Sequence, residues 1–375
     1  MYTWGYYPNG AGGAERQAQL QAEALQRRGH QVSVICSKSS RPQPSVANGV
    51  RVHAFPYFRS RNRLVEALCL VGLFLFLMRR LPGVDVVHVY GPDLKALVIA
   101  FAAWIWRKPL YIKITSGGRD GDLDRNYHRL TKFWTVRRAA ALQTLSAQIT
   151  NEALAAGVKP SRIVDIPNAV DFARFQPVDA AARLQARERL GLPAAEVIVL
   201  YLGRFTGEKG LAVLSDAWAR VVAPEAALLL VGSTAEEAEL PEGIFAGRTA
   251  HTIVREWSNE PQAYYNAADV FVLPSLREGM SNALLEAMAC GLAVACTAVG
   301  AAEAVVEDGV SGLIVPPGQP ARLAAALQRL VQDPALRTRL GAAAASTAHA
   351  RYAVDPVIDR IEAAYAAMLA GKAPN

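Results

Sequence analysis

Short apolar runs alternate with helical stretches along this chain of 375 residues, and the alternation limits the possible fold more than any other feature. In the first half the strand-like runs are QVSVIC, DVVHVY, LYIKIT, ALQTLS and RIVDIP, at residues 31–36, 85–90, 110–115, 141–146 and 162–167. Helical stretches at 15–29 and 95–108 lie between them. Strands that alternate with helices form a parallel sheet with helices on its faces.

The pattern begins again at VIVLYLG, residues 197–203, and continues through a helical stretch at 211–222. Further strand-like runs follow at 227–232, 269–274, 292–297 and 312–316. We therefore predict an α/β protein with two doubly wound, parallel-sheet, Rossmann-like domains, joined within 168–196. Open parallel sheets bind ligands at the carboxyl ends of their strands, so we expect a ligand in a cleft that the two sheets face.

Positive charge is concentrated in the first half of the chain. Residues 1–165 hold 23 Lys and Arg against 10 Asp and Glu, a net charge of +13, whereas residues 166–375 hold 17 against 23, a net charge of −6. Such asymmetry predicts two bodies with different partners, and a basic body suits anionic lipid, a phosphorylated acceptor or nucleic acid. We expect no nucleic-acid partner, because the basic residues are not interleaved with aromatic residues in a recognisable module.

The longest apolar run, LVEALCLVGLFLFLM at 64–78, is followed by Arg79 and Arg80. It is shorter than the about 20 residues that span a bilayer. A helix buried against a sheet, an in-plane membrane contact flanked by RSRNR (59–63), and a true span stay open. No signal peptide is evident, and the four cysteines lack a paired CxxC spacing. We expect a cytoplasmic protein with reduced thiols and no zinc site, with the inner face of the cell membrane as a second location.

Two glycine-containing turns follow strand-like runs, where a ligand is expected. In YYPNGAGGAERQ, Gly10, Gly12 and Gly13 precede a helix whose N–H groups could bind an anion. The turn could equally be structural, because its spacing fits neither the dinucleotide fingerprint nor a P-loop. In YLGRFTGEKG, Arg204 and Lys209 suit a diphosphate, although an ordinary solvated turn is the alternative.

A third segment, REGMSNALLEAMACG (277–291), holds two glutamates eight positions apart. Ser281 or Asn282 can cap its helix. Glu278 then precedes the helix start and Glu286 lies inside the helix, so an anion at the helix N-terminus would have a carboxylate on either side. Helix-surface glutamates are more often only solvated, and this alternative stays open for both.

These segments together resemble the family-4 glycosyltransferases, which are retaining enzymes of the GT-B fold that use nucleotide-sugar donors. The resemblance rests on GGAE, IPNAVD, GRFTGEKG, AADVFVLPS and EGMSNALLEAMACGLAVACTAVG, and extends over nearly the whole chain. Residues 350–369 resemble the terminal helix that returns to the first domain. The expected division is an N-terminal acceptor-side domain at 1–170, a nucleotide-sugar-binding domain at 185–350 and that helix at 351–375.

The resemblance implies a hexosyltransferase that moves a hexose from a nucleoside-diphosphate sugar to a saccharide hydroxyl, with retention. The implied acceptor is a lipid-linked or cell-surface polysaccharide of the cell envelope, reached through peripheral contact with an anionic membrane. Glu278, Arg204 and Lys209 take the catalytic positions, the two cations on the diphosphate and Glu278 against the donor sugar. The donor-binding positions are Gly12, Gly13, Gly279, Met280, Ser281, Asn282, Ala283, Leu285 and Glu286.

Within this resemblance Glu286 binds the ribose hydroxyls, and Trp257 is placed near the base. No cofactor or metal is expected, because Arg204 and Lys209 supply the positive charge. The chain departs from the family pattern after LYIKIT, where Thr115-Ser116-Gly117-Gly118 stands in place of a Leu-His-Gly element. Ser116 could supply a hydroxyl contact there, and His88 and His128 are other candidates.

The first strand, within MYTWGYYP, is expected to be very short. Three other functions stay open. A sugar-nucleotide epimerase or a phosphorylase would use the same fold. A catalytically degenerate homologue would bind nucleotide or glycan as a partner subunit.

Overall fold

The computed structural model describes two compact units in one chain. It covers residues 1–6, 12–37, 44–55, 63–118, 121–123, 129–194, 196–232, 251–258 and 260–374. Unit 1 comprises Met1–Ala169 and Val354–Asn375, and unit 2 comprises Val170–Ala353. Gly10, His128 and residues 59–62, which the sequence singled out, lie outside the described residues.

Unit 1 is built on a sheet whose strands are parallel, apart from one short antiparallel strand at its edge. The strands are β1 (Ser33–Ser37), β2 (Val46–Ala47), β3 (Val50–Phe55), β4 (Val87–Tyr90), β5 (Leu110–Lys113), β6 (Ala141–Thr144) and β7 (Ile163–Asp165). They pair in two groups, β1-β3-β2 and β4-β5-β6-β7. β5 and β6 are buried along their whole length, as expected for strands covered on both faces.

The first residues of the chain join these two groups. The Tyr2 N–H donates to the carbonyl of His88 at 2.8 Å, and the Tyr90 N–H donates back to Tyr2 at 3.0 Å. On the other side the Ile35 N–H donates to the Met1 carbonyl at 2.8 Å. The predicted short first strand is therefore a bridge at Tyr2 between β1 and β4.

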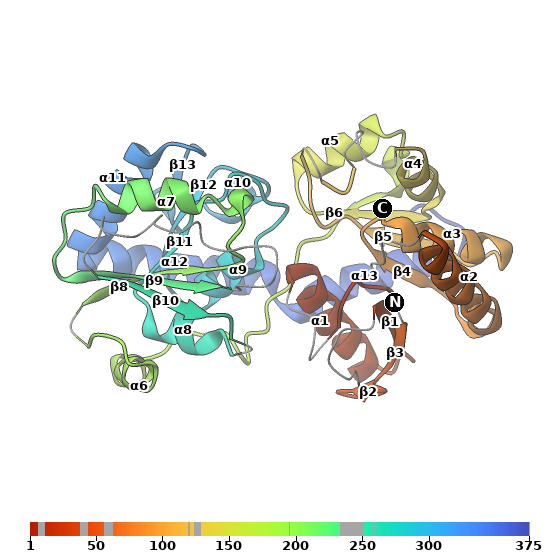
Figure 1. The fold of residues 1–375 in the computed structure, drawn as a ribbon, viewed down its shortest axis with the longest axis horizontal. Coiled ribbons are helices and arrows are strands. Elements are labelled where there is room, and N and C mark those ends of the chain that lie inside the picture. Colours follow the sequence, from red (N-terminus) through yellow and green to blue (C-terminus); the bar gives the residue numbers. More distant parts are fainter. Residues whose placement is uncertain are drawn as a thin grey trace. The chain divides into compact units, whose positions relative to one another are not determined.

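Helices cover the sheet of unit 1. They are α1 (Gly13–Arg27), α2 (Arg63–Arg80), α3 (Leu94–Ile105), α4 (Arg129–Arg138), α5 (Ala147–Ala155) and α13 (Val354–Leu369). Short 3₁₀ turns lie at Leu81–Gly83 and Pro160–Arg162. α1 and α13 share a core with β5, β6 and β7, and the Arg28 guanidinium at the end of α1 contacts Asp355, Asp359 and Glu362 of α13. The last helix of the chain is thus part of unit 1 (Figure 1).

Unit 2 contains an all-parallel sheet in the order β10-β9-β8-β11-β12-β13. Its strands are β8 (Val197–Leu202), β9 (Ala226–Gly232), β10 (Thr252–Glu256), β11 (Val270–Leu273), β12 (Ala293–Thr297) and β13 (Leu313–Val315). Strand order reverses between β8 and β11, which is where doubly wound sheets bind ligands. β10 was missed by the sequence reading, as were β2 and β3.

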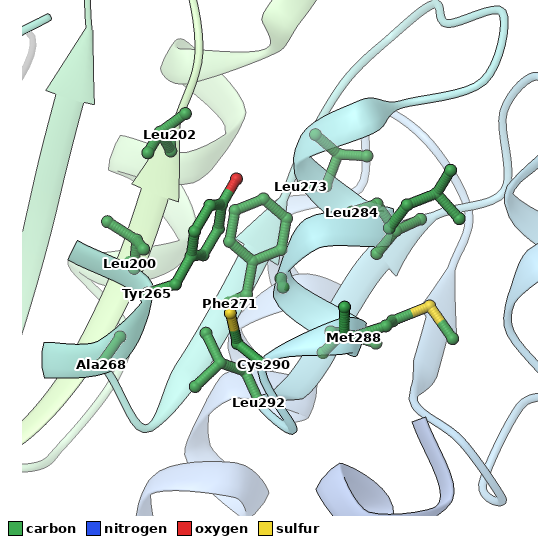
Figure 2. Packing of buried hydrophobic residues seen from close by; sticks show 14 of the residues in the cluster. Leu200, Leu202, Tyr265, Ala268, Phe271, Leu273, Leu284, Met288, Cys290 and Leu292 are labelled. Atoms are coloured by element: carbon green, nitrogen blue, oxygen red, sulfur yellow. The ribbon is translucent and has the colours of Figure 1, made fainter. Parts of the chain in front are cut away.

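Two layers of helices cover the faces of this sheet. The helices are α6 (Ala180–Leu190), η3 (Gly207–Lys209), α7 (Leu211–Trp218), α8 (Gln262–Ala267), α9 (Asn282–Ala289), α10 (Ala302–Val305), α11 (Pro320–Gln332) and α12 (Pro334–Tyr352). Alternate residues of β8 point to opposite faces: Leu200 packs with α8, α9 and α12, whereas Tyr201 packs with α7 and α11. Figure 2 shows the first of these cores, where Tyr265 of α8 lies 6.0 Å from Phe271 of β11, measured between ring centroids.

Candidate functional site

The ends of three neighbouring strands in unit 2 bring the predicted donor-site segments together. β8, β11 and β12 are adjacent and parallel, so the loops that follow them leave the same edge of the sheet. The Leu276 N–H after β11 donates to the carbonyl of Glu208 after β8 at 2.8 Å. The Ala301 N–H after β12 donates to the carbonyl of Gly279, also at 2.8 Å. Loops that follow three different strands therefore form one loop cluster.

Two glycines allow these loops to approach each other. Gly210 has φ +68°, and a Cβ there would lie 2.1 Å from the carbonyl oxygen of Pro274. Gly300 has φ +59°, and a Cβ there would lie 2.4 Å from the carbonyl oxygen of Gly279. Any other residue would both strain the backbone and push the loops apart.

Lys209 and Glu278 form an ion pair within this cluster. The Lys209 Nζ lies 2.8 Å from Oε1 of Glu278, and the two side chains are only 18% and 10% exposed. The family resemblance implies separate roles for these residues, Lys209 on a diphosphate and Glu278 against a sugar. Their contact was not foreseen, because only the adjacency of β8 and β11 places the two loops together.

Ser275 fixes the same carboxylate from the sheet side. Its buried hydroxyl donates to Oε1 of Glu278 at 2.8 Å. The carbonyl of Ser275 in turn accepts from the hydroxyl of Thr297 at the end of β12, at 2.6 Å. Glu278 is therefore held by a chain of hydrogen bonds that begins in the core of the sheet.

Arg204 lies at the rim of the cluster and shares an acidic partner with a second arginine. Its guanidinium lies 3.0 Å from Oε1 of Glu208 and is 61% exposed. The Arg277 guanidinium lies 3.2 Å from Oε2 of the same carboxylate. Glu208 thus bridges one predicted diphosphate-binding residue and an arginine that the sequence reading did not assign.

α9 begins directly after the 274–281 loop, which carries Glu278. Ser281, one of the two predicted candidates, caps the helix, and its hydroxyl accepts from the Leu284 N–H at 3.3 Å. The Leu285 N–H is already bonded inside the helix, to the Ser281 carbonyl at 3.2 Å. The predicted positions Asn282 and Ala283 form the first turn of α9, where the helix dipole favours negative charge. Gly279 and Met280 lead into this turn, and Met280 is partly buried against the core.

Glu286 lies one turn inside α9 and is 7% exposed. Its Oε2 accepts from the hydroxyl of Tyr265 on α8 at 2.9 Å. The same hydroxyl lies 3.3 Å from the carbonyl of Ala283. Glu286 is therefore not a solvated helix-surface residue. Trp257, predicted near a base, follows β10 and is partly buried against the same core.

The remaining predicted donor contacts, Gly12 and Gly13, belong to unit 1. Gly12 is the N-cap of α1 and Gly13 its first residue. A Cβ on Gly12 would lie 2.0 Å from a carboxylate oxygen of Glu15, so this glycine makes room for a side chain that folds back over the helix start.

A carboxylate organises the loop where relatives are expected to carry a histidine. Oδ2 of Asp122 accepts from the Thr115 N–H at 2.6 Å, the Thr115 hydroxyl at 2.9 Å and the Ser116 N–H at 3.2 Å. His88 is 1% exposed in the core, where its Nδ1 lies 2.6 Å from the Tyr365 hydroxyl. Burial, followed by the charges of the N-terminus and Lys113, holds the pKa of His88 well below its usual range.

The loop cluster in unit 2 contains two largely buried charged side chains, Lys209 and Glu278, and an exposed one, Arg204. Tyr201 lies beneath it and donates to the carbonyl of Arg204 at 2.8 Å. Burial, and next the negative charge of Glu278, raise the pKa of this phenol, which stays a neutral donor. Among the described residues, no group of three or more His, Cys, Asp or Glu side chains is arranged to hold a metal ion.

Sequence reasoning missed Ser275, Glu208, Arg277 and Tyr265 as members of this cluster. Ser275 and Glu208 stand inside DVFVLPS and GEKG, so their closeness to the predicted residues was visible in the sequence. Nothing in the sequence marks Tyr265, which comes from a different helix.

Two family models match the chain, one on each half. The model described as "Glycosyl transferase 4-like domain" matches residues 12–169. The model described as "Glycosyl transferases group 1" matches residues 196–333.

Curated relatives carry the name D-inositol 3-phosphate glycosyltransferase. The one from Kineococcus radiotolerans is 30% identical over 90% of this chain and 86% of that protein. The one from Segniliparus rotundus is 35% identical over 57% of this chain and 49% of that protein. The chain spans about half the length of the first relatives that it matches.

Solved glycosyltransferase structures share the fold. Sucrose-phosphate synthase from Thermosynechococcus elongatus has a TM-score of 0.81 at 24% identity, covering 98% of this chain and 96% of that one. HepE from Anabaena, in complex with UDP and glucose, has a TM-score of 0.77 at 20% identity, covering 96% and 97%. With matching models on both halves and a relative aligned over most of both lengths, the chain belongs to the family-4 glycosyltransferases and has their GT-B fold.

Proposed function

We propose that this protein transfers a hexose from a nucleoside-diphosphate sugar to a saccharide hydroxyl, with retention of configuration. The observation that carries the proposal is the Lys209–Glu278 pair, pinned by Ser275 beside the N-terminus of α9. A cation and a helix N-terminus suit the diphosphate of such a donor, and a carboxylate suits its sugar. All of these groups lie at one edge of the sheet.

The chemistry follows from the charges that develop during transfer. Cleavage of the sugar–phosphate bond leaves negative charge on the diphosphate, which Lys209, Arg204 and the α9 amides would stabilise. The sugar becomes oxocarbenium-like, and the carboxylate of Glu278 would stabilise it. The acceptor hydroxyl attacks from the face that the diphosphate leaves, and its proton passes to the leaving phosphate oxygen. In this proposal the fixed cations provide the charge stabilisation without a metal.

Glu286 would bind the ribose hydroxyls of the donor. Tyr265 already holds one of its carboxylate oxygens, which fixes the side chain before a ligand arrives. Gly12 and Gly13 keep the role that the resemblance gives them, beside the donor phosphate. The solved complexes of HepE with UDP and with UDP-glucose favour UDP as the first nucleotide to test.

The acceptor in this proposal is a lipid-linked saccharide of the cell envelope, at the inner face of the cell membrane. The excess of basic residues in the first 165 supports an anionic acceptor or surface. The name of the curated relatives supplies a second, phosphorylated acceptor, D-inositol 3-phosphate, which belongs in the same assay.

The experiment is a calorimetric titration of the purified chain with UDP, GDP, ADP and dTDP. Lys209→Ala and Glu286→Ala are measured beside Lys159→Ala and Glu303→Ala, which replace exposed residues of the same types. One nucleotide should bind, and the two site variants should lose affinity by about tenfold or more, because each removes a charged hydrogen bond. The two control variants should bind as the wild type does.

Turnover then separates the possible functions. Sugar transfer to a lipid-linked saccharide or to D-inositol 3-phosphate, followed by NMR of the product's anomeric centre, would establish reaction and stereochemistry. Release of a sugar phosphate that depends on added phosphate would indicate a phosphorylase. Nucleotide binding without turnover of any offered acceptor would favour the degenerate homologue. A folded protein that binds none of the four nucleotides would contradict the proposal.

A further inference from the structure

Helix α2 exposes an apolar stripe on the surface of unit 1. Leu68, Val71 and Leu75 are 63%, 54% and 60% exposed, and their spacing of three and four residues places them on one face. Leu73 and Leu77 are buried on another face of the same helix. α2 therefore packs one face against the core of unit 1 and exposes large aliphatic side chains on another face. An exposed apolar patch of this kind marks an interaction surface.

The apolar surface continues onto α3, which packs beside α2 (Figure 1). The ring of Phe74 on α2 lies 5.9 Å from that of Phe101 on α3, and Phe101 lies 5.7 Å from Trp104. Phe101, Trp104 and Trp106 are 42%, 54% and 39% exposed. The sequence reading had confined the apolar contact to residues 64–78. The structure adds the aromatic side chains of Phe101, Trp104 and Trp106 to this apolar surface.

Arginines border this surface. The guanidinium of Arg138, at the end of α4, lies 5.2 Å from the ring centroid of Trp104 and 4.3 Å from that of Trp134. Arg79 and Arg80 end α2 and are exposed. Cations stacked on or beside interfacial tryptophans keep their charge at the level of lipid headgroups while the rings reach deeper.

Acidic residues are nearly lacking on the same three helices. Within the bounds of α2, α3 and α4 the one acidic residue is Glu66. It is two positions from Leu68, well off the exposed stripe, and its charge acts on Lys95. Arg107, exposed just after α3, adds another positive charge. The rim of the surface is therefore positive.

We propose that this face of unit 1, formed by Leu68, Val71, Leu75, Phe101, Trp104 and Trp106 with Arg79, Arg80, Arg107 and Arg138, docks in the plane of an anionic lipid bilayer. We call it the α2–α3 face. The inference rests on the proposed function to the extent that a lipid-linked acceptor requires such contact. Aliphatic and indole side chains would enter the headgroup boundary, and the arginines would meet lipid phosphates.

Charge decides between this partner and a second copy of the chain. A two-fold contact of the α2–α3 face with itself would place arginines of one copy opposite those of the other, at a cost in repulsion. An anionic bilayer instead offers lipid phosphates to the arginines and an apolar interior to the aliphatic and aromatic side chains. Among the described residues no helix has the length and hydropathy to cross a membrane, so the contact proposed is in-plane.

The test is cosedimentation of the full chain with vesicles of phosphatidylcholine alone and of phosphatidylcholine mixed with phosphatidylglycerol. The chain should bind the anionic vesicles more tightly, and salt should weaken that binding. Replacing both Arg79 and Arg80 by Gln should lower the anionic-vesicle affinity by about 25-fold, about fivefold for each charge, with little change on neutral vesicles. Leu68→Gln or Trp104→Gln should lower the affinity on both kinds of vesicle by about tenfold.

Matched controls lie in unit 2. Leu184, at 51% exposure on α6, and the exposed Arg322 on α11 are changed to Gln, and these variants should bind vesicles as the wild type does. Sedimentation velocity of the same proteins detects self-association. A dimer that Leu68→Gln dissociates, or vesicle binding that no α2–α3 variant lowers, would overturn the proposal. So would the absence of vesicle binding by a folded chain.

Failure here is distinguishable from failure of the proposed function. Nucleotide titration is carried out on the same protein samples without vesicles, and the variants that test it, Lys209→Ala and Glu286→Ala, lie in unit 2. A chain that binds a nucleotide but ignores vesicles would retain the donor site and lose only this inference. A chain that binds vesicles but no nucleotide would contradict the proposed function and leave this inference intact.

Discussion

Replacing Lys113 by methionine should stabilise the protein at mildly acid pH and have little effect at pH 9. Lys113 ends β5 and is 1% exposed in the core of unit 1. Its ammonium donates to Oδ1 of Asn168 at 2.7 Å and lies 5.7 Å from the centroid of the Tyr90 ring. Burial lowers the pKa of Lys113 from its ordinary 10.5 to about 7.

The sign follows from proton binding. Between pH 7 and pH 10.5 the unfolded chain holds a proton on Lys113 that the folded chain has released, so this residue makes stability rise with pH in that window. Below pH 7 the full cost of burying the charge applies, roughly 5 kcal/mol for a pKa difference of about 3.5. From about pH 6.5 to about pH 9 the contribution of Lys113 to the free energy of unfolding rises by about 2–3 kcal/mol.

Methionine has no such cost, but it removes the hydrogen bond that Lys113 donates to Oδ1 of Asn168, a loss of about 1–3 kcal/mol at every pH. With that loss subtracted, the free energy of unfolding of Lys113→Met should exceed that of the wild type by roughly 2 kcal/mol at pH 6.5. At pH 9 the two free energies should be nearly equal. Urea unfolding at both pH values measures the two free energies of unfolding. Hydrogen exchange of β5 peptides during the titration identifies the transition of unit 1.

The exposed Lys159→Met serves as the control and should unfold as the wild type does at both pH values. The decisive quantity is the difference between wild type and Lys113→Met as a function of pH. Equal pH dependence in the two proteins would refute the reasoning, because it would mean that Lys113 keeps its ordinary pKa inside the fold.

Three further substitutions test unit 2. Ser275→Ala removes one of the two groups that hold Oε1 of Glu278, so turnover should fall about tenfold while nucleotide affinity, measured by calorimetry, changes little. Arg187→Leu should destabilise unit 2 by about 3 kcal/mol in urea unfolding, because Arg187 is 6% exposed and contacts Asp269 at 2.5 Å. Gly300→Ala should lower nucleotide affinity together with the melting temperature, since its Cβ would displace the loop that carries Glu278.

The sequence was sufficient to predict most of the scaffold. Buried parallel strands such as β8 and β9 are continuous apolar runs, and such runs are visible without a structure. β3 and β10 were missed because their residues are mixed: β10 alternates partly exposed positions, as an edge strand does. The join between the domains was predicted within 168–196, and α6, which lies in that range, belongs to unit 2, where Arg187 contacts Asp269.

Part of the candidate site was also predictable. Local patterns are enough to limit the N-cap to Ser281 or Asn282 and to put Arg204 and Lys209 just after a strand. The same patterns could not assign partners. Glu286 reads as a surface glutamate on its own helix, and only Tyr265, from another helix, shows that it is held in the core.

The sequence by itself determined the element types, the family and the residues that carry charge at the strand ends. Those depend on local periodicity and on motifs, which are written in consecutive residues. The tertiary structure decided which of them meet: Lys209 with Glu278, Glu208 with two arginines, and Phe74 of α2 with Phe101 of α3. Strand order and helix packing join segments far apart in the chain, and no local pattern records which neighbours they acquire.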